Sequence, residues 1–243
     1  MSIVRLDLAY DGTGFHGWAV QPRQRTVEGE ISDVLTQILG SAPKLSVAGR
    51  TDTGVHARGQ VVSFAAGLDP AKIAAAINSM LGPEVVVLRA APAPEGFDAR
   101  RSAVAREYRY RIDLGPVADP FSARFVWHRP KELALTPMRA AAKRLLGRHD
   151  FASFARAPAD GRGTVRRLER LSISRRGDRV EIAVRANAFA HQMVRSLVGT
   201  LVAVGEGRLK PSDMARILRA KDRSAAWHIA PAGGLTLERV YYG

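Results

Sequence analysis

Cysteine is absent from this 243-residue sequence. Without thiols the chain can form neither a disulfide nor a thiolate metal site, which is consistent with a reducing compartment, and we expect a cytoplasmic protein. No apolar run approaches the ~20 residues that a membrane-spanning helix requires. The first residues lack a basic flank followed by an apolar core. We therefore expect neither a membrane partner nor a signal peptide.

Acidic residues are scarce, but only in the second part of the chain. Residues 1–100 contain 9 Lys or Arg and 10 Asp or Glu, a net charge of −1, whereas residues 101–243 contain 28 and 13, a net charge of +15. A strongly basic half predicts a polyanionic partner, of which RNA and DNA are the usual ones. An alternative explanation is a genome that favours arginine codons, because only 6 of the 37 cations are Lys.

The first hundred residues alternate between strand and helix patterns. Apolar residues alternate over 4–10, and Thr26 is a suitable N-cap for a helix that ends at Gly40. Asp69 and Pro70 begin a second helix that ends before Gly82. Further strands are predicted over 45–47, 61–64 and 85–88, and we expect the last of these, a continuous apolar run, to be buried on both faces. The element order is β-α-β-β-α-β.

After Pro92 and Pro94, which mark a domain boundary, a similar order returns. The predicted elements are a strand over 104–114, a helix over 136–146 capped by Thr136, strands over 165–173 and 180–184, helices over 189–204 and 214–218, and a strand over 235–241. Residues 115–133 and 148–164 are expected to be irregular. If the short helix is set aside, this half repeats β-α-β-β-α-β.

The repeated order predicts an α+β chain with two ferredoxin-like subdomains, residues 1–100 and 101–243. Each is expected to have a mainly antiparallel sheet with helices on one face. The other sheet face is then free, as it is in proteins that bind single-stranded RNA.

A separate motif in the first half must also be considered. Gly12, Gly14 and Gly17 match the G-x-G-x-x-G pattern of dinucleotide-binding proteins. That fingerprint must open a helix at once, and no helix is predicted before Thr26, so we reject it.

The stretch 48–57, Ala-Gly-Arg-Thr-Asp-Thr-Gly-Val-His-Ala, lies between two predicted strands. Glycines bracket its single carboxylate, Asp52, and allow close approach of a ligand to the backbone. Arg50 is two positions away, and a cation at that spacing favours the ionised carboxylate, which can act as a nucleophile. The alternative is an ordinary turn, in which Asp bonds to its own backbone and Arg50 forms a weak surface ion pair.

This stretch resembles the signature loop of the tRNA pseudouridine synthase A family, whose core reads Gly-Arg-Thr-Asp-x-Gly-Val-His. Three other segments are similar to the family: Tyr10–Trp18, the Tyr-Arg-Tyr string that starts at Tyr108, and the Met-Val-Arg string that ends at Arg195. Ala19 follows the tryptophan where the family usually has Gln. The resemblance implies two ferredoxin-like subdomains that share a continuous sheet, an RNA cleft between them, and a homodimer.

The resemblance also implies a reaction, the isomerisation of uridine to pseudouridine at positions 38, 39 and 40 of the tRNA anticodon stem-loop. Asp52 is then the nucleophile, which attacks either the ribose or the base, and Arg50 orients it. Tyr108 stacks on the target base, although without the family match it could equally be a sheet-packing aromatic. Arg195 meets the catalytic Asp, although an arginine on an apolar helix usually reaches the surface.

Other side chains are candidates for RNA contact rather than for chemistry. His56 is predicted either to be structural or to contact the substrate RNA, and phosphate contacts with the substrate are predicted for Arg58, Arg148, Arg162, Arg166 and Arg167. The six histidines are scattered without a paired spacing, so no metal centre is expected. The implied isomerisation has no redox step, so no cofactor is expected either.

Two other functions remain open at this stage. Asp52-Thr53-Gly54 is also the tripeptide of aspartic peptidases, whose chemistry needs two carboxylates that share a proton. With a single copy of the tripeptide, a dimer would be required, and the nearby Arg50 would favour the doubly charged pair that such a site must avoid. The second alternative is a non-catalytic RNA-binding module, which the fold and charge alone would favour.

Overall fold

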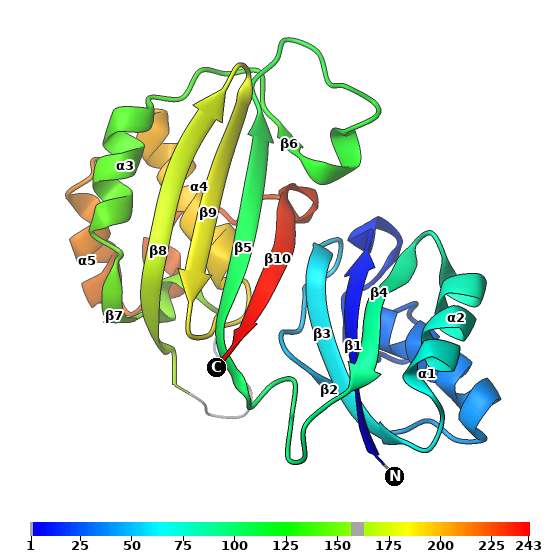
Figure 1. Cartoon of the computed structure of the whole chain (residues 1–243). Helices are drawn as coiled ribbons and strands as arrows, with labels where there is room; N and C mark the ends of the chain where they lie inside the picture. Colours follow the sequence, from blue (N-terminus) through cyan, green and yellow to red (C-terminus); the bar gives the residue numbers. More distant parts are fainter. Residues whose placement is uncertain (1, 157–162) are drawn as a thin grey trace. The chain divides into compact units, whose positions relative to one another are not determined.

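The computed structural model describes residues 2–156 and 163–243, which form a mixed α/β chain with mostly antiparallel strand pairing and five α-helices. The chain divides into two compact units. The first contains Met1–Val104 together with Thr236–Gly243, and the second contains Ala105–Leu235. Figure 1 labels the elements of both units. The predicted phosphate contact Arg162 lies outside the described residues.

The first unit contains two helices and a sheet that the C-terminal strand joins. Its elements are β1 (Ser2–Tyr10), α1 (Val27–Leu39), β2 (Ser46–Val47), β3 (His56–Ala66), α2 (Pro70–Leu81), β4 (Val85–Pro92) and β10 (Leu235–Tyr242). The strand order is β4-β1-β3-β10, with β2 paired to β3. β1 is antiparallel to β3 and β4, whereas β10 is parallel to β3. α2 packs on β4 and against α1, and the buried residues of β1 face this layer.

Local signals placed both helices of this unit correctly. The Thr26 hydroxyl accepts a hydrogen bond from Gly29 N–H, and the Asp69 carboxylate accepts one from Ala71 N–H. Gly40 ends α1 in the left-handed conformation, with a φ of 81°. Each cap satisfies backbone groups that a helix end would otherwise leave unpaired.

Two strand predictions for this unit are wrong. β4 is not buried on both faces, because it lies at the edge of the sheet and Leu88 is 62% exposed. β3 starts at His56 rather than near residue 61, so the end of the Asp52 stretch is strand rather than loop. An apolar run alone does not distinguish an edge strand from a central one, which explains the first error.

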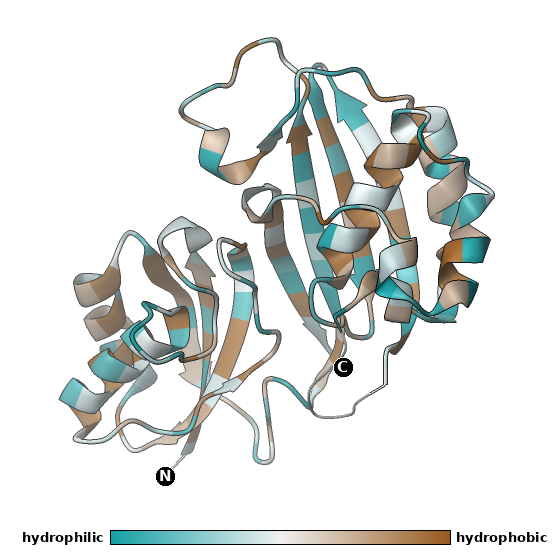
Figure 2. Cartoon of the chain, turned by 180° about the vertical axis from the view of Figure 1, so that it is seen from behind, coloured by the Kyte–Doolittle hydropathy of each residue, from teal (hydrophilic) through white to brown (hydrophobic). Residues whose placement is uncertain are grey.

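The described residues of the second unit include five strands and three α-helices. Its elements are β5 (Ala103–Asp113), β6 (Trp127–His128), α3 (Leu135–Lys143), β7 (Gly147–Asp150), β8 (Val165–Arg176), β9 (Arg179–Ala186), α4 (Met193–Gly205) and α5 (Asp213–Ala220). The strands run β5-β9-β8-β7, all antiparallel, with β6 parallel to β5. Figure 2 shows the alternation of hydrophilic and hydrophobic residues along these strands and the helices on one face of the sheet. Short 3₁₀ turns occur in the described residues of both units, at 12–14 in the first and at 123–125, 152–154, 223–225 and 232–234 in the second.

Three predictions for the second unit differ from the structure. α3 begins at Leu135 without a side-chain cap, so Thr136 lies inside the first turn, where Pro137 is tolerated. α4 begins at Met193 rather than at residue 189, because Gln192 adopts a left-handed conformation with a φ of 62°. Part of the predicted loop 148–164 is strand β7, which pairs with β8. In the described part of the chain, no helix has the length and apolar character needed to cross a membrane.

Candidate active site

Asp52 lies in the first unit, on the loop that joins β2 to β3. Its side chain is partly exposed, whereas Thr51 and Val55 on either side are 6% and 2% exposed. Val55 N–H donates to the Asp52 carbonyl over 3.1 Å, and Gly54 has a φ of 75°. The loop therefore turns tightly around the carboxylate while its flanks are anchored in the core.

The N-terminal segment after β1 contacts this loop along its length. Trp18 N–H donates to the Thr51 carbonyl over 3.0 Å, and Gly54 N–H donates to the Phe15 carbonyl over 3.2 Å. These backbone bonds are made by residues far apart in the sequence, so they fix the loop against a separate segment. The similarity of Tyr10–Trp18 to the family thus has a structural explanation, because this segment positions the Asp52 loop.

A buried polar network fixes the other side of the loop. The Tyr10 hydroxyl and the Thr51 hydroxyl are 2.8 Å apart and share a hydrogen bond. Gln60 donates through Nε2 to Tyr10 Oη over 3.2 Å and to the Gly49 carbonyl over 2.6 Å. Burial raises the pKa of Tyr10 to about 12, although both hydrogen bonds oppose the shift. The phenol is therefore neutral at physiological pH and acts as a hydrogen-bonding group.

Two glycines of the rejected G-x-G-x-x-G pattern, Gly12 and Gly17, serve this contact. A Cβ on Gly12 would lie 2.1 Å from the Val55 carbonyl oxygen. Gly17 has a φ of 89°, and a Cβ there would lie 2.9 Å from the Thr51 carbonyl oxygen. Close approach between the two backbones thus requires glycine at both positions.

The other predicted residues of the first unit differ in exposure. His56 is only 2% exposed, and its Nδ1 accepts a hydrogen bond from Gly12 N–H over 2.9 Å. An Asp11 carboxylate oxygen lies 3.1 Å from the same nitrogen. Arg50 and Arg58 are exposed, at the beginning of the loop and on β3. The structure thus groups Arg50, Asp52 and His56 on one loop and its boundary.

Tyr108 and Arg195 belong to the second unit. Tyr108 on β5 is 7% exposed and contacts Phe189 edge-to-face, with ring centroids 5.1 Å apart. Arg195 on α4 donates through Nε to the Ala230 carbonyl over 2.8 Å, and Ala230 N–H donates back to the Arg195 carbonyl over 3.1 Å. The arginine is half-buried and is held by main-chain contacts at its own helix and at the 230 segment.

Sequence reasoning missed two residues that support the predicted site residues, one in each unit. Tyr110, two positions after Tyr108, donates to the Pro231 carbonyl over 2.8 Å, next to the Ala230 carbonyl that binds Arg195. Burial raises the pKa of Tyr110, and the charge of Arg195 acts in the opposite direction. In the first unit, Gln60 was missed, although a lone amide just before the apolar run 61–64 was a signal for a buried polar contact.

Comparison with known proteins agrees with the family resemblance of the Asp52 stretch. A family model described as tRNA pseudouridine synthase matches residues 141–243. The tRNA pseudouridine synthase A of Frankia casuarinae is 48% identical, with 98% of this chain and 89% of the relative covered. The enzymes of that name from Halalkalibacterium halodurans and Brevibacillus brevis are 43% and 42% identical, over 97% and 100% of this chain and 90% and 100% of theirs.

A solved structure of a Cbf5-Nop10-Gar1 complex aligns with 97% of this chain at 14% identity and a TM-score of 0.37, and this chain spans 58% of the matched chain's length. That similarity is too low to inform the fold. The sequence relatives are far more similar and extend over nearly all of both chains. On their identity and coverage, this chain belongs to the tRNA pseudouridine synthase A family.

Proposed function

We propose that this protein isomerises uridine to pseudouridine in tRNA. The observation that carries the proposal is the family's signature loop, which presents Asp52 partly exposed between two buried flanks. In the reaction the glycosidic bond from ribose to the uracil nitrogen breaks, the uracil rotates, and a bond from ribose to a uracil carbon forms. That carbon loses its proton, and the released ring nitrogen gains one. Atoms and electrons balance within the nucleotide, so the isomerisation consumes no second substrate.

Asp52 is the nucleophile of this proposal, with attack at the ribose or at the base as the two routes. Arg50, exposed beside it, orients the carboxylate and the incoming nucleotide. Tyr108 stacks on the target base, and Arg195 stabilises negative charge on the nucleophile. His56 has a different role, because a ring that is 2% exposed and bonded to Gly12 supports the loop rather than touching the substrate.

The second unit supplies the positive charge for RNA. It contains 26 Lys or Arg and 12 Asp or Glu, a net charge of +14, whereas the first unit is neutral. On β7 and β8, Arg148 is paired with Arg167, and both side chains are exposed. Like charges that face each other across a strand pair are destabilising, and a bound phosphate relieves that repulsion. Arg166 is opposite His149 on the same strands, and we include it and the exposed Arg58 among the RNA contacts.

The finer features of the proposal come from the family. They are ferredoxin-like subdomains that share a sheet, an RNA cleft between them, a cytoplasmic homodimer, and action at uridines 38, 39 and 40 of the anticodon stem-loop. In the first unit, the strand order β4-β1-β3, with β2 on β3, supports the ferredoxin-like assignment. Size-exclusion chromatography with light scattering tests the homodimer, for which a mass twice the 26.4 kDa of the chain is expected.

The experiment that tests the function uses unmodified tRNA transcripts. After incubation with the protein, pseudouridine is mapped by chemical labelling and reverse transcription, and tRNA affinity is measured in parallel. We expect pseudouridine at positions 38–40 with the wild type and none with Asp52→Ala or Asp52→Asn, although both variants retain tRNA binding. Asp33→Ala, which removes an exposed carboxylate from α1, is the matched control and retains activity. Bound tRNA that stays unmodified by the wild type would show a non-catalytic RNA-binding module instead.

A further inference from the structure

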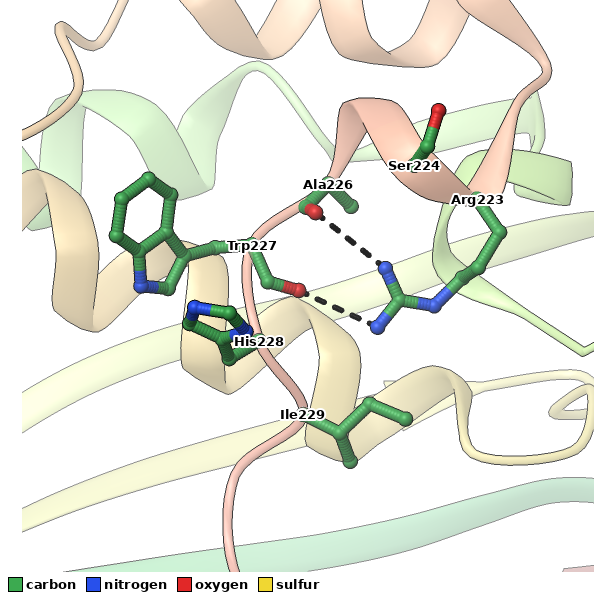
Figure 3. A pocket seen from close by; sticks show the side chains of 6 residues that line it. All are labelled: Arg223, Ser224, Ala226, Trp227, His228 and Ile229. Atoms are coloured by element: carbon green, nitrogen blue, oxygen red, sulfur yellow. Dashed lines mark hydrogen bonds between the residues drawn. The ribbon is translucent and has the colours of Figure 1, made fainter.

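A hollow of about 680 Å³ lies in the second unit, beside the segment that follows α5. Arg223, Ser224, Ala226, Trp227, His228 and Ile229 line it (Figure 3). This volume is within the range of sites that bind small molecules or nucleotides. None of these residues belongs to the Asp52 loop, and none has a role in the proposed reaction.

The aromatic side of the hollow is formed by Trp227 and His228, which Figure 3 shows next to each other. Their rings meet edge-to-face with centroids 5.4 Å apart, and the Arg208 guanidinium lies 5.8 Å from the centre of the Trp227 ring. Trp227 is partly exposed and His228 is exposed. An aromatic ring beside a guanidinium at the surface is the arrangement on which unpaired bases stack.

The backbone under this aromatic pair is fixed to α4. Trp227 N–H donates to the Thr200 hydroxyl over 3.2 Å. A Cβ on Gly199 would lie 1.8 Å from the His228 carbonyl oxygen, so helix and segment are in direct contact there. The rings are therefore held on a rigid support, which reduces the entropy lost when a ligand binds.

The cations around the hollow outnumber the carboxylates that pair with them. Glu206, whose side chain is 4% exposed, pairs with both Arg129 and Arg208, with 3.0 Å between Arg208 Nε and its carboxylate. Burial, together with the charge of Arg208, lowers the pKa of Arg129. Arg223 donates to the carbonyls of Ala226 and Trp227 (Figure 3). One more carboxylate is adjacent, that of Asp222, which is exposed and bonded to Ser224.

We infer that this hollow binds a nucleotide of the RNA substrate other than the one that is isomerised. A base stacks on Trp227, and its phosphate is bound by Arg208 and Arg223. The inference rests on the proposed function, which supplies the RNA. Trp227 is three residues before Ala230, which binds Arg195, so their Cα atoms are within roughly 11 Å of each other. The bound nucleotide is therefore a near neighbour of any uridine that Arg195 serves.

The test compares Trp227→Ala, Trp227→Phe and Arg208→Gln with the wild type, using one tRNA transcript and the full-length protein. Phe121→Ala is the matched control, because Phe121 is an aromatic residue that is 94% exposed on another loop. Loss of one stacked base weakens binding about tenfold. We expect Trp227→Ala and Arg208→Gln to raise the Kd and KM for tRNA about tenfold, with a much smaller change in kcat, and Trp227→Phe to restore most of the affinity.

Two further measurements keep the inference separate from the proposed function and from misfolding. Thermal unfolding identifies any variant that fails to fold. If Trp227→Ala is such a variant, the tRNA affinities of Trp227→Phe and Arg208→Gln test the inference instead. Photocrosslinking with tRNA that contains 5-bromouridine should attach RNA to the peptide that includes Trp227. If the wild type forms pseudouridine while Trp227→Ala and Arg208→Gln bind tRNA within twofold of it, the inference is overturned and the function stands. If the wild type forms none, the function fails regardless of these variants.

Discussion

At Gly12, the addition of a single methyl group is expected to lower activity strongly. A Cβ there would lie 2.1 Å from the Val55 carbonyl oxygen, and a backbone atom cannot move aside as a flexible side chain can. We expect Gly12→Ala to displace the Asp52 loop, to lower pseudouridine formation at least tenfold and to destabilise the protein by about 1–3 kcal/mol. Gly14→Ala is the control, since its nearest contacts are 3.4 Å away at the ends of Arg25 and Glu84. Equal activity of the two variants would contradict the assigned contact.

Tyr10 gives a prediction that depends on pH. Because the folded pKa of Tyr10, about 12, is above the usual tyrosine value of 10.0, its contribution to stability is complete below pH 10 and is lost as pH rises toward 12. Tyr10→Phe removes the hydroxyl bond to Thr51 and should cost about 1 kcal/mol at pH 8. Urea unfolding at pH 8 and 11 is the measurement, and the difference between wild type and variant should shrink to near zero at pH 11. A constant difference would show that the phenol does not titrate as assigned.

The sequence was sufficient to propose Asp52 and Arg50, because a short contiguous string carries them. The residues that hold them were harder to predict. Tyr10 and Thr51 are 41 positions apart, and Gln60 and Tyr10 are 50 apart. Composition and periodicity describe neighbours along the chain, so they do not identify partners at such separations. The partners of His56 could not be identified for the same reason, since only the folded chain shows that Gly12 donates to its ring and that Asp11 lies beside it.

Whole elements were predicted best where a local interaction defines them. Thr26 and Asp69 cap their helices through bonds to residues two or three positions away, which a sequence can reveal. β7, Gly-Arg-His-Asp, has no apolar alternation and exists because β8 pairs with it, so it was predicted as loop. The late start of α4 depends on the left-handed Gln192, a conformation that its residue type does not suggest.

The contact between α4 and the segment after α5 yields a prediction for these two elements. Gly199→Ala places a Cβ 1.8 Å from the His228 carbonyl oxygen and must separate helix and segment. The same segment contains Ala230, so the variant should also disturb the Arg195 bond. We expect a loss of about 1–3 kcal/mol in urea unfolding and reduced pseudouridine formation. Gly67→Ala, where no atom lies within 4 Å, should match the wild type in both assays. Unchanged stability of Gly199→Ala would disprove the close contact.

For the molecule as a whole, charge is concentrated in the second unit, whose net charge is +14, while the first unit is neutral. If this charge binds tRNA phosphates, affinity must fall with salt, because each neutralised phosphate releases counterions. With roughly four phosphate contacts, raising the salt from 50 to 200 mM should weaken binding about a hundredfold.

The double variant Arg148→Gln with Arg167→Gln tests where those contacts lie. Each arginine that binds a phosphate contributes about one unit to the slope of log affinity against log salt. The double variant should therefore bind more weakly at 50 mM salt and show a slope shallower by up to about two. Arg89→Gln, which removes an exposed cation from the neutral first unit, is the matched control and should leave the slope unchanged. If the double variant kept the wild-type slope while Arg89→Gln lowered it, the phosphate contacts would belong to the first unit, and the excess arginine would reflect codon usage rather than RNA binding.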